Sequence, residues 1–194
     1  MELLTGFGLA TAAGLNAYIP LLALGLLARF TDLVTLPAGW AWLENGWVVV
    51  IVAVLLTVEV VADKVPALDS VNDVVQTLVR PTAGGIVFGS GTAAQTQAVS
   101  DPGAFADSGQ WIPVVLGIAT ALVVHLTKTA VRPVANATTA GVAAPVLSTV
   151  EDVASVGLVF VVILLPVLVL VIVAGIAWGA VALFRRRRGT RSRS

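Results

Sequence analysis

The sequence contains no cysteine, which excludes disulfide bonds, thiol catalysis and thiolate metal ligands. Charged residues are scarce as well: Asp, Glu, Lys and Arg make up 11% of the 194 residues, whereas a soluble domain has about 25%. So few charges cannot cover a surface that faces water. Apolar residues instead make up 58% of the chain, and the mean hydropathy is +0.99. The composition therefore indicates a membrane protein.

Two long apolar runs support this conclusion: WVVVIVAVLLTV at 47–58 and VGLVFVVILLPVLVLVIVAGIAWGAVALF at 156–184. Each is long enough, or nearly so, to cross a hydrocarbon core of about 30 Å as a helix. We therefore expect an all-α, polytopic membrane helix bundle. A single integral membrane domain is expected over 1–184, followed by a basic, disordered cytoplasmic tail over 185–194.

About six membrane segments are expected, with five as the alternative if 134–151 is only re-entrant. Between the second and third segments, a short amphipathic helix at 70–80 is predicted to begin after the cap Asp69 and to end at Pro81. The six segments are 5–29, 47–64, 82–99, 111–131, 134–151 and 153–184.

The basic residues predict the orientation, because cytoplasmic segments carry an excess of Lys and Arg. The arginine-rich tail at 185–194 predicts that the C-terminus is cytoplasmic. The expected location is the plasma (cell inner) membrane. The acidic loops at 30–46 and 100–110 then face outward. The basic residues expected on the cytoplasmic side are Lys64, Arg80, Lys128 and Arg132.

Aromatic and small residues add two further expectations. Trp40, Trp42 and Trp47 are typical of an aromatic belt at a membrane–water interface. Segments rich in Gly, Ala and Thr predict closely packed helices. The similar tetrapeptides TAAG, TAGG and TTAG (11–14, 82–85 and 138–141) suggest three repeated helical hairpins.

Two helix ends carry opposite charges. Glu59 and Asp63 are four residues apart and share one face of the second segment. His125, Lys128 and Arg132 are three and four residues apart and share one face of the fourth. An ion in hydrocarbon costs about 2.5–3.5 kcal/mol, so we expect the acidic and basic stripes to pair near the cytoplasmic boundary.

Other polar residues complete the candidate substrate- or ion-binding site. Asn16 lies near the middle of the first segment. Glu151 and Asp152 form a second acidic pair, expected on the outer side of the membrane. No catalytic residue, cofactor or metal site is predicted. The remaining candidates lie around the short helix: Lys64, Asp69, Asn72, Asp73 and Arg80.

Two interpretations of these charges remain open. They form either an ionic clamp between helices, with Lys64 and Arg132 extending to the interface, or a polar cavity that opens to the cytoplasm. The cavity would handle an ion, a proton or a charged head group. More charge is present than a clamp requires, which favours the cavity.

The whole chain before the tail resembles a known family, the membrane family called domain of unknown function 4126. The resemblance implies a small multi-spanning membrane protein and no particular activity. It rests on an ordered set of motifs: GLNAYIPLLALGLLAR (14–29), EVVADKVPALDSVND (59–73), VRPTAGG (79–85), HLTKTAVRP (125–133) and STVED (148–152).

A weaker similarity connects EVVADK at 59–64 with the Glu-x-Gly-Asp-Lys signature of small cation/proton exchangers. Here one extra residue separates the two acids, and Ala62 stands in place of glycine. A hard cation also prefers several oxygen ligands, and an acidic helix that faces a basic one supplies few.

The leading functional hypothesis is a transporter or channel-like protein with a charged cytoplasmic vestibule for a small anionic solute or a lipid head group. The alternatives are a structural or assembly subunit of a membrane complex, and a cation/proton exchanger. No zinc-protease, serine-hydrolase or diphosphate-binding motif is present, so no enzyme activity is expected. The expected partners are membrane lipids, a second copy of the chain or a membrane complex, and no nucleic acid.

Overall fold

The computed structural model describes residues 2–91, 109–140 and 142–165. Every regular element in these ranges is a helix, so the all-α prediction is confirmed for them. The expected tail at 185–194 lies outside the described residues. The elements are α1 (Glu2–Leu15), α2 (Tyr18–Phe30), the 3-10 helix η1 (Ala38–Glu44), α3 (Gly46–Ala62), α4 (Pro66–Gly91), α6 (Trp111–Thr138) and a further helix, Ala143–Leu165.

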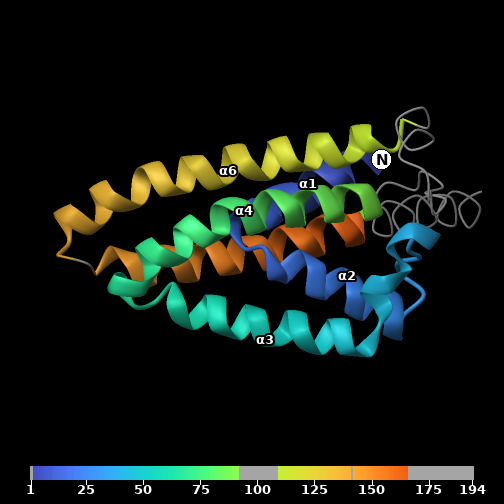
Figure 1. Ribbon diagram of the computed structural model, residues 1–194, viewed down its shortest axis with the longest axis horizontal. Helices are drawn as coiled ribbons and strands as arrows, with labels where there is room; N and C mark the ends of the chain where they lie inside the picture. Colours follow the sequence, from blue (N-terminus) through green and yellow to red (C-terminus); the bar gives the residue numbers. More distant parts are fainter. Residues whose placement is uncertain (1, 92–108, 141, 166–194) are drawn as a thin grey trace, which may run out of the picture.

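The longer helices lie side by side along the bundle (Figure 1). We call the end at which α3 and α6 begin the tryptophan end, and the opposite end, at which α4 begins, the charged end. α4 packs mainly against α6 and α1, while α2 packs mainly against α3 and η1. α1, α4 and α6 therefore pack closely against one another.

The first predicted segment, 5–29, forms a hairpin of two helices, α1 and α2. α1 enters from the tryptophan end, where Gly6 lies against the ring of Phe88. α2 returns to the same end, where Arg29 Nη1 donates a hydrogen bond of 2.9 Å to the carbonyl of Glu44. The apex of the hairpin lies in the middle of the bundle (Figure 1). The prediction of one continuous helix here is wrong.

Asn16 and Pro20 explain the break between α1 and α2. In a continuous helix the ring of Pro20 would clash with the carbonyl of Asn16, four residues earlier. The side chain of Asn16 instead caps α2, because its Oδ1 accepts hydrogen bonds from the backbone N–H groups of Tyr18 (3.1 Å) and Ile19 (3.2 Å). The local sequence thus both interrupts the helix and satisfies the new helix start.

Two described helices, α6 and Ala143–Leu165, are long and apolar enough to cross a membrane. A third span is obtained if η1 and α3, which meet at an angle of 65°, are counted as one. The described residues therefore contain two or three candidate spans, and the six-segment layout is not confirmed.

α4 is a single helix of 26 residues in which Pro81 is an interior residue. The prediction of a short helix at 70–80, capped by Asp69 and ended by Pro81, is therefore wrong. α4 turns its polar face inward: Arg80 is 0% exposed, whereas Leu78 is 77% exposed. Such an inside-out helix is expected when lipid replaces water around the bundle, because neighbouring helices then satisfy its polar groups.

The segment 134–151 does not cross the bundle. α6 continues to Thr138, and the next helix begins at Ala143, so only a short turn separates them. Both of these helix ends lie at the charged end (Figure 1). The prediction of a crossing or re-entrant segment at 134–151 is wrong, because Pro133 is accommodated inside α6.

Small residues bring α1 and α4 close to the same part of α6. A Cβ atom added to Gly84 of α4 would overlap the side chain of Ala121 and lie 2.6 Å from the carbonyl oxygen of Gly117. A Cβ added to Gly14 of α1 would lie 2.8 Å from the carbonyl oxygen of Ala121. The tetrapeptides at 11–14 and 82–85 are thus packing motifs, as expected. The third, at 138–141, begins at the end of α6 and does not extend the pattern.

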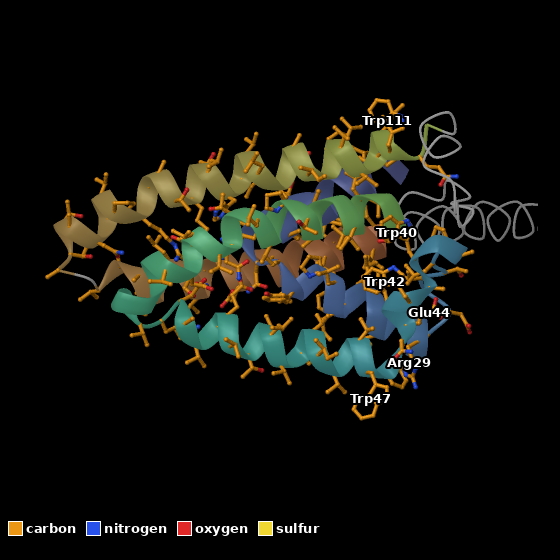
Figure 2. The ribbon with its side chains drawn as sticks, in the orientation of Figure 1. Arg29, Trp40, Trp42, Glu44, Trp47 and Trp111 are labelled. Carbon is orange, nitrogen blue, oxygen red and sulfur yellow. The ribbon has the colours of Figure 1, made fainter. Side chains whose placement is uncertain are left out.

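The tryptophans gather at one level of the bundle. Figure 2 shows Trp40, Trp42, Trp47 and Trp111 at the tryptophan end, the end at which Arg29 also lies. Trp47 is the most exposed of the four, at 79%. This arrangement is typical of an interfacial aromatic belt, and the placement of this belt at a membrane surface remains a prediction.

Replacing Gly84 by alanine should destabilise the protein. The new methyl group would meet the α6 backbone, and overpacking of this kind costs about 1–3 kcal/mol. The matched control is Gly157→Ala, because a Cβ at Gly157 meets nothing within 4 Å. Thermal unfolding in detergent should show a lower Tm for Gly84→Ala and an unchanged or higher Tm for Gly157→Ala. Equal values would contradict the close packing.

Candidate functional site

Charged side chains from four helices meet toward the charged end, and we call this set the charged network. Its members approach one another to between 2.6 and 3.7 Å. Lys64 is the most exposed member, with a side chain that is 40% exposed. The network comprises Glu59, Asp63 and Lys64, Asp73 and Arg80 of α4, Lys128 and Arg132 of α6, and Glu151 and Asp152 of the last described helix.

Asp63, just after the last residue of α3, is the centre of the network. Its Oδ2 atom lies 3.6 Å from Arg80, 3.7 Å from Lys128 and 3.5 Å from Arg132. Its other oxygen accepts a hydrogen bond from Asn72 Nδ2 at 2.5 Å. One buried carboxylate therefore contacts three cations, and the predicted pairing of the acidic and basic helix ends is what the structure shows.

Glu59 pairs with Arg80 in the interior, where neither side chain is exposed by more than 1%. Arg80 Nη2 donates to Glu59 Oε1 at 2.9 Å. Within the described part of the chain, Glu59 Oε2, Arg80 Nε and Gln76 Oε1 are buried without a hydrogen-bond partner. These three atoms comprise one donor and two acceptors, so this side of the network has unused hydrogen-bonding capacity.

His125 is held as the neutral imidazole. Its Nδ1 atom lies 3.3 Å from Arg80 Nη1, and a guanidinium can only donate, so Nδ1 accepts. Its Nε2 atom lies 3.0 Å from the hydroxyl of Thr77, which itself donates to the carbonyl of Asp73. The proton of the imidazole is therefore assigned to Nε2. The result is a continuous hydrogen-bonded chain from Arg80 to the α4 backbone.

Glu151 bridges two cations of α6. Its Oε2 atom lies 2.7 Å from Lys128 and 2.6 Å from Arg132, which also lies 3.7 Å from Asp73. The prediction that Glu151 and Asp152 lie on the opposite side of the membrane from the cluster is wrong. Their helix starts at the charged end, so the acidic pair joins the same network.

The network also holds the apex of the hairpin. Asn16 Nδ2 donates to Asp152 Oδ1 at 2.9 Å, and Asp152 pairs with Lys64 at 3.7 Å. Lys128 Nζ donates to the carbonyl of Leu15 at 3.2 Å, at the last residue of α1. The break between α1 and α2 thus lies directly against the ions, and Asn16 bonds both within the hairpin and to another helix.

The structure brings together almost all of the predicted site residues. Asp69 lies in α4, but its side chain is outside the described part of the structure. Arg132 is 2% exposed, so the interpretation that it extends to the interface is wrong. Thr77 was missed, although it lies four residues from Asp73 and three from Arg80, a spacing that places all three on one helix face.

The buried charged side chains of the network need partners of opposite charge. The network contains four basic and five acidic side chains. Removing one partner of a buried pair leaves an uncompensated ion, at a cost of about 3–5 kcal/mol. The described side chains contact one another directly, so each cation has a carboxylate partner within the protein.

Fold and site together define a helical protein with two or three candidate membrane spans and a buried network of ion pairs. The chain belongs to the family described as domain of unknown function (DUF4126), whose model matches residues 3–186. The resemblance found in the sequence is thereby confirmed over nearly the whole chain. No curated protein and no solved structure matches the chain.

Replacing Asp63 by asparagine should destabilise the fold strongly. Three buried cations would lose their shared carboxylate, and we expect a loss of about 3–5 kcal/mol in the free energy of unfolding. Asp32→Asn is the control, because Asp32 is an exposed carboxylate at the tryptophan end. Denaturation in detergent, followed by circular dichroism, measures both variants. If Asp63→Asn were as stable as the control, the central role of Asp63 would be disproved.

Proposed function

We propose that this protein is a small membrane transporter or channel-like protein, and that the charged network is its site for a small anionic solute or a lipid head group. The observation that carries the proposal is a network of nine charged side chains beside the break in the α1–α2 hairpin, five of which are buried: Glu59, Asp63, Arg80, Lys128 and Arg132. Ionisable residues are expensive inside membrane segments, and they commonly mark pathways for substrates, ions or protons.

The broken hairpin supports this proposal. Many transporters bind their cargo at interrupted helices, where the free N–H groups of one half-helix face an anion. Here the first N–H groups of α2 are turned toward Asn16, and the last carbonyl of α1 receives Lys128. Moving either side chain would free the corresponding backbone groups for a ligand.

Helix lengths support a position for the charged network in the half of the membrane that lies opposite the tryptophan belt. At 1.5 Å per residue, Glu59 lies about 18 Å and Asp63 about 24 Å along the helix from Trp47. Lys128 lies about 26 Å from Trp111 by the same rule. If the belt marks one interface of a hydrocarbon core of about 30 Å, the network extends from inside the core to its other boundary.

The charged end is assigned to the cytoplasm, because Lys64 and the other basic residues of the network lie there. α3, α4, α6 and the Ala143–Leu165 helix extend between the two ends (Figure 1), and we assign each of them as a crossing. The α1–α2 hairpin enters from the outer, tryptophan end. In this layout Leu165 lies toward the outer, tryptophan end, so the described residues do not place the C-terminus. Its cytoplasmic location rests on the arginine-rich sequence at 185–194, and we place the protein in the plasma membrane.

The absence of native cysteine makes the orientation testable with single-cysteine variants. Thr139→Cys marks the charged end, and Thr35→Cys marks the tryptophan end. On intact cells, an impermeant maleimide should label Thr35→Cys and should label Thr139→Cys only after lysis. The reverse pattern would invert the assignment, and labelling of both would place the two positions on one side of the membrane.

Lys128→Gln should abolish transport in proteoliposomes, because it removes a cation that faces the hairpin break. One assay follows chloride efflux, and the other follows dithionite reduction of fluorescently labelled phosphatidylglycerol. We expect the native protein to exceed empty liposomes in at least one assay. Arg29→Gln is the control, since Arg29 is an exposed cation at the tryptophan end.

Circular dichroism and size-exclusion chromatography establish that Lys128→Gln remains folded. If it does not fold, Lys64→Gln at the exposed edge of the network replaces it. Native protein that is no more active than empty liposomes in both assays would contradict the proposal. So would full transport by a folded Lys128→Gln variant.

The direct contacts within the network favour a second candidate, a structural or assembly subunit. Every cation of the network already has a carboxylate within 3.7 Å, as a clamp requires. In that case charge variants would lower stability without changing flux, and purification from the native membrane would retain a stoichiometric partner. A cation/proton exchanger is less favoured, because no group of acidic or histidine side chains in the described residues could hold a metal ion.

A further inference from the structure

A groove lies on the surface between α6 and the Ala143–Leu165 helix, directly beside the charged network. Its volume is about 350 Å³, which falls within the range of ligand pockets. The groove surface is mostly apolar, and three nearly buried ionic side chains contribute to its lining. The lining residues are Leu15, Val123, Val124, Thr127, Val131 and Leu147, with Lys128, Arg132 and Glu151.

The ionic lining is suited to one negative charge. Lys128 and Arg132 together carry two positive charges, and Asp63 and Glu151 both lie within 3.7 Å of each of them. One further anion is therefore compensated only if it takes the place of the Glu151 carboxylate. The Glu151 carboxylate lies 2.7 Å from Lys128 and 2.6 Å from Arg132, so the two cations already converge on a single oxyanion. A phosphodiester could receive the same charge-assisted hydrogen bonds if Glu151 moved aside.

The walls of the groove indicate what carries that charge. Val123 is 64% exposed and Val131 is 55% exposed, so the groove opens onto an apolar surface of the bundle. A hydrated free anion gains nothing from such walls, whereas an acyl chain would bury apolar surface against them. Charge and apolar surface therefore coincide as they do in an anionic lipid.

We propose that this groove is a lateral binding and entry site for a monoanionic phosphodiester lipid. Its head group is held by Lys128 and Arg132 in exchange with Glu151, and an acyl chain lies between the two helices. The statement that this lipid is the cargo rests on the proposed transport function. Because Lys128 also bonds the carbonyl of Leu15 at 3.2 Å, a bound head group would reach the break in the hairpin.

Lipid binding to the purified full chain is measured by native mass spectrometry, with phosphatidylglycerol and phosphatidylcholine of identical acyl chains. We expect phosphatidylglycerol to bind at least about tenfold more tightly, because the choline cation of phosphatidylcholine cancels the charge of its phosphodiester and would lie beside Lys128 and Arg132. Glycerophosphoglycerol, the same phosphodiester without acyl chains, should bind far more weakly than the lipid. Tight binding of glycerophosphoglycerol would make the head group alone the ligand and would overturn the lipid assignment.

A groove-filling variant tests the location without removing a charge. Val131→Trp should weaken phosphatidylglycerol binding by at least about tenfold, because the indole occupies the acyl-chain site. Val134→Trp is the matched control: Val134 is an equally apolar, 67% exposed residue of α6 that does not line the groove. Equal binding by both variants, or equal affinity of the native protein for the two lipids, would overturn the proposal.

Glu151→Gln gives a second, opposite signal. Removing the internal carboxylate frees Lys128 and Arg132, so binding of phosphatidylglycerol should tighten. Unchanged or weaker binding by a folded variant would contradict the exchange. The two proposals can also fail separately. If phosphatidylglycerol binds in the groove but the protein transports neither lipid nor chloride, only the transport proposal is contradicted. If the protein transports, but no lipid binds in the groove and Val131→Trp leaves transport unchanged, only the lipid site is contradicted.

Discussion

The structure depends on the electrostatic compensation of buried ions. Arg80, Lys128 and Arg132 come from two helices and point into an interior where an unpaired charge costs several kcal/mol. Asp63, at the end of a third helix, lies within 3.7 Å of all three. This single carboxylate therefore fixes the relative positions of α3, α4 and α6 near the charged end.

Small residues and the hairpin make this arrangement possible. Gly84 and Gly14 let α4 and α1 approach the α6 backbone, which brings the polar face of α4 against the polar face of α6. The break at Asn16 then places two helix ends beside the ions. There Lys128 donates a hydrogen bond to the carbonyl of Leu15, and Asp152 accepts one from the side chain of Asn16. Close packing, the broken helix and the ion pairs are thus one connected feature, and the proposed transport and lipid sites both use it.

Sequence reasoning could predict the pairing of Asp63 with the α6 cations, because helical spacing and the cost of a bare charge are local arguments, whereas Glu59 pairs instead with Arg80 of α4. It could not predict that Glu151 joins them, since that depends on Pro133 and Pro81 being tolerated inside long helices. Tertiary contacts decide whether a proline ends a helix or lies within it. The hairpin break did have a local signal, because Pro20 follows the capping residue Asn16 by four positions.

The central claim is that the buried charges are stable only as mutual partners, and a charge reversal of the pair Lys128 and Glu151 tests it most directly. Thermal unfolding of Lys128→Glu, Glu151→Lys and the double variant would be compared in detergent. We expect each single reversal to unfold the protein or to lower its Tm sharply, and the double reversal to recover a large part of the loss. Single variants as stable as the native protein, or a double variant no better than either single one, would contradict it.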